Sequence, residues 1–179
     1  MHDWNVVVTV REGAFVRACR LLQAMGRVDR TEFFNVLVMR SDDPEQLPEW
    51  LHGRMADDPE AADVIARLVP LTCLFNFQSP GAFEKNAVEA VSRWVPSLAG
   101  KSFHARMRRR GFKGRLSSMD EERFLDEYLL ETLEKAGSPG RISFDDPDFI
   151  IAVETVGTRA GLSLWSRDDL MRYPFLGLD

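Results

Sequence analysis

The chain has 179 residues, of which 45% are hydrophobic and 28% charged, and its formal net charge is −5. This balance excludes a disordered or fibrous protein, and the length allows one sizeable core or two small sub-domains. No apolar run approaches the roughly 20 residues of a membrane span, and the N-terminus lacks the basic start and apolar stretch of a signal peptide. We therefore expect a cytoplasmic protein with no membrane partner.

The first part of the chain predicts strands that alternate with helices. Phe15, Ala18, Leu22 and Met25 recur at spacings of three and four, which indicates a helix over 14–25 that stops at Gly26. Acidic turns with proline predict two short helices, or one broken helix, between residue 42 and residue 68. Runs of apolar and β-branched residues predict strands at 4–10, 33–39 and 69–77, the second of them central in its sheet.

The second part of the chain continues this alternation. Ser118 and Glu121 form a capping-box pattern at the start of the strongest predicted helix. Helices are expected at 82–94 and 118–136, and strands at 101–109, 141–144, 149–156 and 162–165, the last two as a hairpin. The pattern is that of an α/β sheet protein. A soft boundary near residues 77–80 divides it into an N-terminal part, 1–77, and a second domain, 78–179.

Known catalytic and metal-binding motifs are not found in the sequence. Cys19 and Cys73 lie in apolar segments without CxxC spacing, so we expect two buried thiols. The Rossmann glycine motif, the P-loop, HExxH and GxSxG are missing. We therefore expect no catalytic residue, metal site or cofactor, and an enzyme with catalytic residues scattered along the sequence remains an alternative.

Cations concentrate in one short segment, residues 101–115. It contains no acid, so the remainder of the chain carries a formal charge of −12. Local charge asymmetry of this kind decides where a polyanion can bind. The seven cations are Lys101, Arg106, Arg108, Arg109, Arg110, Lys113 and Arg115.

The alternation of side chains along a strand predicts two different faces for residues 102–110. His104, Arg106, Arg108 and Arg110 fall on one face, and apolar residues fall on the other. Alternate arginines, about 7 Å apart, approximate the spacing of phosphates along a nucleic-acid strand. The alternative is a solvated edge strand that its charges protect from aggregation.

The loop at 111–117 adds to the anion-binding pattern. Its glycines let backbone amides approach an anion, and the N-terminus of the next helix adds a positive dipole. Phe112 fits either a base-stacking platform or a loop anchor packed on the body. We expect His104 to be a hydrogen-bonded surface residue, because no acid or cysteine stands near it in sequence.

The run KSFHARMRRRGFKG at 101–114, the capped helix after it and ISFDDPDFIIAVE at 142–154 resemble a THUMP domain. In that family a strand of the type F-x-[VA]-R-x-[KR]-R-[RG] precedes a helix, and a strand with a Pro-Asp turn follows. The order holds from about residue 69 to the end, where RYPFL resembles the closing segment of stand-alone THUMP proteins. VVVTVREGAF and FNVL are similar to the ferredoxin-like part that precedes THUMP.

The resemblance implies an α/β fold with an N-terminal ferredoxin-like α+β part and a THUMP-type α/β domain with a mixed sheet. THUMP domains recognise the acceptor end of tRNA and are usually fused to a modifying enzyme, for which this chain leaves no room. The likeness is greatest to stand-alone adaptors that present tRNA to a separate cytidine acetyltransferase. The acidic remainder suggests that such a partner supplies part of the affinity for tRNA.

The RNA contacts follow from the resemblance and the charge pattern together. The resemblance implies the four arginines of the matched strand, and the charge pattern adds the lysines and the loop. The predicted RNA-binding residues are Lys101, His104, Arg106, Arg108, Arg109, Arg110, Phe112, Lys113 and Arg115. The other functions left open are an RNA-modifying enzyme with an unrecognised site and a protein-interaction module with a basic docking strand.

Overall fold

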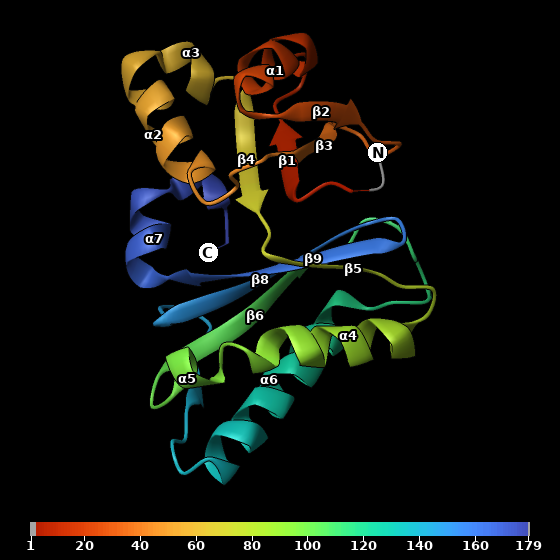
Figure 1. Cartoon of the computed structure of the whole chain (residues 1–179), viewed down its shortest axis with the longest axis vertical. Helices are drawn as coiled ribbons and strands as arrows, with labels where there is room; N and C mark the ends of the chain where they lie inside the picture. Colours follow the sequence, from red (N-terminus) through yellow and green to blue (C-terminus); the bar gives the residue numbers. More distant parts are fainter. Residues whose placement is uncertain (1–2, 179) are drawn as a thin grey trace. The chain divides into compact units, whose positions relative to one another are not determined.

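The computed structural model describes residues 3–178, which form two compact units (Figure 1). The first unit contains residues 3–72 and 170–177, and the second contains residues 73–169 and 178. The chain therefore passes to the second unit a few residues before the boundary expected near 77. Within residues 3–178, no helix is long and apolar enough to cross a membrane.

The first unit is built on a four-stranded antiparallel sheet. Its strands have the order β2-β3-β1-β4, so β3 is central, as its apolar sequence predicted. Strands and helices alternate in the ferredoxin-like order βαββαβ. The elements are β1 (Val6–Val10), α1 (Phe15–Leu22), η1 (Gln23–Met25), β2 (Arg27–Arg30), β3 (Val36–Arg40), α2 (Leu47–Asp57), α3 (Pro59–Ala62) and β4 (Ile65–Pro70).

The C-terminal segment returns to the first unit, where no element was expected from the sequence. It contains the end of α7 (Arg167–Arg172) and η2 (Pro174–Leu176). Arg172 donates to both carboxylate oxygens of Glu49, at 2.5 and 2.8 Å, and the Tyr173 hydroxyl donates to the same group at 2.7 Å. These hydrogen bonds from Arg172 and Tyr173 lower the pKa of Glu49 to about 2.

The second unit is built on a five-stranded mixed sheet with the order β5-β9-β8-β6-β7. β6 is parallel to β7 and β8, and the other pairs are antiparallel. The elements are β5 (Cys73–Asn76), α4 (Pro80–Ser92), α5 (Val95–Leu98), β6 (Ser102–Arg108), α6 (Ser118–Lys135), β7 (Arg141–Ile142), β8 (Phe149–Val156) and β9 (Arg159–Ser166). Together the two units confirm the expected fold class, a ferredoxin-like part and a THUMP-type α/β part.

Helices α4 and α6 cover one face of this sheet (Figure 1), and the hydrophobic core of the unit lies between them and the sheet. Phe103, Ala105 and Met107 point from β6 into that core, where they meet buried leucines of α6 such as Leu125 and Leu129. The apolar side of β6 is therefore where the alternation of the sequence placed it. Burial of this row fixes which side chains of β6 face the opposite side of the sheet.

Several local expectations differ from the structure. The single strand expected at 69–77 is two strands, β4 and β5, in different sheets, and β2 and α5 were not predicted. The cap of α6 is Ser117, whose hydroxyl accepts the Asp120 N–H at 3.3 Å, and not Ser118. Cys73 is buried as expected, whereas Cys19 is partly exposed.

Candidate nucleic-acid interface

The free edge of β6 is covered by carboxylates of α6. β7 pairs only with Ser102 and Phe103. Beyond it, Asp126 Oδ1 accepts the Ala105 N–H at 2.9 Å and Glu122 Oε1 accepts the Met107 N–H at 2.8 Å. The strand thus has no open edge here that its cations must protect, which weakens the interpretation of the basic segment as a protected edge.

His104 is buried, so its expected position at the surface is wrong. Its side chain is only 6% exposed, and its Nδ1 lies 2.8 Å from Asp126 Oδ2. Phe144 packs edge-on against the imidazole, with 4.6 Å between ring centroids. Asp126 lies 22 residues away in sequence, which is why no acid was expected beside this histidine. The geometry assigns His104 to holding the Asp126 carboxylate in place.

The four arginines at 106–110 have different surroundings. Arg108 is exposed and Arg106 is half-buried. Arg109 lies after the strand and donates to the carbonyl of Gly111. Arg110 forms an ion pair of 2.5 Å with Glu154, whose side chain is 1% exposed. The prediction that Arg110 lies in an exposed row is wrong, because β6, and with it the alternation of side chains, ends at Arg108. The Arg110 side chain instead pairs with a buried carboxylate.

The loop after β6 is held tightly to the body. Phe112 has a left-handed φ of 54° and packs on Phe77 with 4.9 Å between ring centroids. The Arg115 guanidinium lies over the Phe112 ring, 4.8 Å from its centroid. This geometry favours the loop-anchor interpretation of Phe112. Gly111 has φ 97°, and a Cβ there would lie 3.2 Å from the Cα of Gly157, so this glycine permits a close backbone approach.

The N-terminus of α6 already carries negative side chains. Asp120 and Glu121 lie in its first turn, and Ser117 occupies the cap. The exposed Asp120 carboxylate offsets the positive end of the helix dipole that was expected to attract phosphate. The cations of the loop at 111–117 are exposed, but the N-terminus of α6 adds little positive potential beside them.

The exposed cations fall at two ends of β6. Arg108 ends the strand, whereas Lys101 precedes it and lies about 23 Å from Arg108 at roughly 3.3 Å per residue, so this predicted contact stands apart from the others. Lys113 and Arg115 are exposed in the loop next to Arg108. We call the set Arg106, Arg108, Lys113 and Arg115 the basic end.

Arg159 is a further cation near the basic end, and it was not predicted. It begins β9, directly after the turn whose Gly157 N–H donates to the Arg110 carbonyl at 2.9 Å. The sequence placed this residue inside a hairpin loop, with no signal that the turn would meet the loop after β6.

Comparisons with known proteins show the fold of the chain. It is similar to PH1313 from Pyrococcus horikoshii, with a TM-score of 0.60 and 12% identity over 92% of this chain and 55% of that one. It is also similar to a 4-thiouridine synthetase solved with RNA and bound ATP, with a TM-score of 0.52 and 14% identity over 92% and 42%. TrmN from Thermus thermophilus gives a TM-score of 0.53 and 17% identity over 90% and 44%.

The chain spans about half, or less, of the length of these structures. No family model matches the sequence, and no curated protein matches it. The likeness therefore establishes the architecture of both units, and the chemistry must be argued from the residues of this chain.

Proposed function

We propose that the protein binds RNA, tRNA in particular, through the basic end and presents it to a separate tRNA-modifying enzyme. The observation that carries the proposal is the exposure of Arg108, Lys113 and Arg115 within eight residues at the end of β6, in a chain that is otherwise acidic. Arginine forks onto phosphate oxygens, and backbone phosphates dominate RNA affinity. The fold that the chain shares with a synthetase solved with RNA supports the same ligand.

The finer part of the proposal comes from the THUMP resemblance. It assigns the acceptor end of tRNA as the bound region and a cytidine acetyltransferase as the partner enzyme. A formal charge of −12 outside residues 101–115 favours RNA binding together with a partner enzyme, because repulsion of the phosphates limits how tightly this chain alone binds RNA. We place this assembly in the cytoplasm.

The test is tRNA binding by a triple variant, Arg108→Ala with Lys113→Ala and Arg115→Ala. A matched control removes three exposed cations at the other end of β6, namely Lys101, Lys135 and Arg141. The first variant should lose at least tenfold in affinity for every tRNA alike, because it removes about three phosphate contacts. The control should stay within about twofold of the wild type. Equal affinities for the two variants would remove the basic end as the binding site.

Crosslinking to cellular RNA supplies the identity of the ligand. The peptide attached to RNA should come from residues 106–115, and the bound species should be tRNA. A crosslink to another class of RNA would overturn the tRNA assignment and keep RNA binding.

An enzymatic role is the alternative that a specific feature favours. His104 and Asp126 line a hollow of about 410 Å³ together with Met119, Ile142 and Phe144. A histidine beside a carboxylate can move a proton, although Asp126 is also engaged by the Ala105 N–H. Purified protein with unmodified tRNA and common donors, followed by nucleoside mass spectrometry, separates the two roles. A modified nucleoside formed without any partner protein would identify an enzyme.

A protein-interaction module remains the other alternative, in which the basic end binds an acidic partner. Pull-down from the protein's own cell extract, with and without added tRNA, distinguishes it. Partners that tRNA displaces share the basic end with RNA, whereas partners that it leaves in place use another surface.

A further inference from the structure

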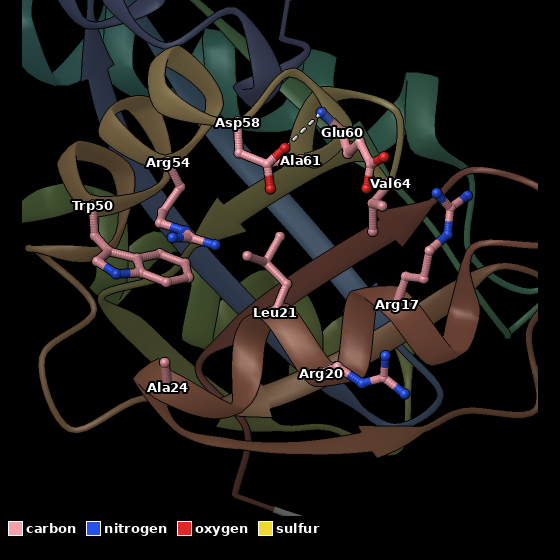
Figure 2. A pocket seen from close by; sticks show the side chains of 10 residues that line it. All are labelled: Arg17, Arg20, Leu21, Ala24, Trp50, Arg54, Asp58, Glu60, Ala61 and Val64. Atoms are coloured by element: carbon pink, nitrogen blue, oxygen red, sulfur yellow. Dashed lines mark hydrogen bonds between the residues drawn. The ribbon is translucent and has the colours of Figure 1, made fainter.

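A second group of cations lies in the first unit, around a hollow of about 480 Å³ between α1, α2 and α3. Arg17 and Arg20 line it from α1, and Arg54 lines it from α2. Leu21 and Trp50 supply its apolar surface. Figure 2 shows Arg54 and Trp50 side by side on α2, with Leu21 between them and the arginines of α1. We call this hollow the arginine pocket.

The three guanidinium groups of the arginine pocket are available to a ligand. All three residues are exposed, and none of these groups forms an ion pair or hydrogen bond with another residue of 3–178. Two carboxylates also line the hollow, but Asp58 is engaged as the cap of α3, where it accepts the Glu60 N–H at 3.0 Å. The cations therefore outnumber the carboxylates, and one of the carboxylates already has a partner.

Helix electrostatics alone do not account for this arrangement. Arg20 and Arg54 each lie in the last turn of their helix, where a cation suits the helix dipole. Arg17 lies in the middle of α1 and gains nothing from that effect. The dipole also gives no reason for cations of two helices to surround one hollow beside a half-buried tryptophan.

The dimensions and chemistry of the arginine pocket fit one class of ligand. A volume of about 480 Å³ lies within the usual range for small-molecule sites, roughly 300–1,000 Å³. Guanidinium groups bind phosphate through forked hydrogen bonds, and an indole face stacks a nucleobase. We propose that the arginine pocket binds a nucleoside phosphate, with the phosphate between the guanidinium groups and the base against Trp50.

The nucleoside phosphate can come from two sources, a free nucleotide or an unpaired nucleotide of a bound RNA. Both present the same phosphate and base to the pocket. The proposal is independent of the basic end, because none of the residues of that set lines the arginine pocket.

The test is binding of adenosine 5′-monophosphate to the full chain, measured by calorimetry and by tryptophan fluorescence. The nucleotide should quench part of the fluorescence, and Trp50→Phe should abolish that quenching while the three other tryptophans remain. Arg54→Ala and the double variant Arg17→Ala with Arg20→Ala should each weaken binding about tenfold or more. Arg54→Lys should recover part of the affinity, because it restores the charge without the fork.

Arg27→Ala is the matched control. Arg27 is an exposed arginine of the same unit, on β2 and outside the pocket, and its surface ion pairs contribute little. It should leave nucleotide binding unchanged. A loss in Arg27→Ala equal to that in Arg54→Ala would overturn the site, as would inorganic phosphate binding as tightly as the nucleotide.

A single-stranded tetra-adenylate identifies the source. Much tighter binding of this oligomer than of the mononucleotide assigns the pocket to RNA, and the reverse assigns it to a free nucleotide. No binding of either probe overturns the proposal. The triple variant of the basic end should bind the mononucleotide normally, so failure of the arginine pocket and failure of the proposed tRNA site give different results.

Discussion

Arginines that are neighbours in the sequence have opposite roles in the structure. Arg108 is exposed at the end of β6, whereas two residues later Arg110 forms an ion pair with the buried Glu154. A buried carboxylate needs such a partner, because desolvation of an unpaired charge costs several kcal/mol. A variant that removes Arg110 together with surface arginines would therefore confuse a loss of stability with a loss of RNA binding.

We predict that Arg110→Ala destabilises the protein by about 3 kcal/mol, because it removes the ion pair that Arg110 forms with the buried Glu154 carboxylate. Lys113→Ala, which removes an exposed loop cation, should change the free energy of unfolding by less than about 0.5 kcal/mol. Urea denaturation measures both. Adding Glu154→Gln to Arg110→Ala should recover part of the loss, since no charge then remains buried. Equal stability of Arg110→Ala and Lys113→Ala would contradict an internal role for Arg110.

At the scale of elements, α6 acts as a clamp on β6. Two carboxylates of α6 take the place of a strand that would otherwise pair with this edge. Asp126 accepts a hydrogen bond from the Ala105 N–H, and Glu122 accepts one from the Met107 N–H. Both acids lie on the same side of α6 because they are four residues apart. The clamp fixes the strand that leads into the basic end.

We predict that Asp126→Ala opens this edge. The variant leaves the Ala105 N–H and the His104 ring without their acceptor, and should cost about 1–3 kcal/mol. Amide hydrogen exchange should rise at Ala105 far more than at residues of β8. Glu127→Ala, the same change at the exposed neighbouring position, should leave exchange at Ala105 as it is in the wild type. Unchanged protection of Ala105 in Asp126→Ala would show that the clamp is not needed.

The contact between α4 and α6 contains a carboxyl group that holds its proton unusually tightly. Glu121 is 4% exposed, and burial, together with the charges of Glu84 and Asp120, raises its pKa to about 7. In the unfolded chain this carboxyl titrates near 4.5. Between these values the folded state binds a proton that the unfolded state has lost. The stabilising contribution is therefore complete below about pH 4.5 and is lost as the pH rises through 7.

We predict that Glu121→Gln is more stable than the wild type above pH 7, by on the order of 1–3 kcal/mol, and gains nothing below pH 4.5. The amide cannot ionise, so the variant avoids a buried charge beside Glu84. Denaturation in urea at several pH values measures the difference. Glu131→Gln, an exposed position on the same helix, should follow the wild type at every pH. A wild-type-like pH profile in Glu121→Gln would contradict the raised pKa.

The sequence predicted the elements better than the surroundings of individual residues. Strand β8 and its hairpin with β9, helix α6 and the apolar side of β6 follow from periodicity and turn residues, which are local signals. The ion pair of Arg110 and the His104–Asp126 contact join residues 44 and 22 positions apart. The arginine pocket combines α1 with α2. No local pattern records such distances, so the sequence located the basic segment but not which of its cations remain exposed.

At the scale of the whole molecule, an acidic chain with a small basic surface should bind RNA with modest strength and a moderate dependence on salt. The formal charge of −12 outside residues 101–115 opposes long-range attraction of a polyanion. Affinity then depends on a few phosphate contacts at short range, and each contact releases counterions from the RNA.

We predict that the logarithm of tRNA affinity falls with the logarithm of salt concentration with a slope of about −3 to −4, as expected for about four phosphate contacts. The triple variant Arg108→Ala, Lys113→Ala and Arg115→Ala should reduce the slope by about 3, since each lost phosphate contact removes about one unit. Titrations between 50 and 200 mM salt, about the range over which such slopes are resolved, measure both. The control variant without Lys101, Lys135 and Arg141 should keep the wild-type slope. An equal reduction in both variants would mean that RNA responds to the total charge of the chain and not to the basic end.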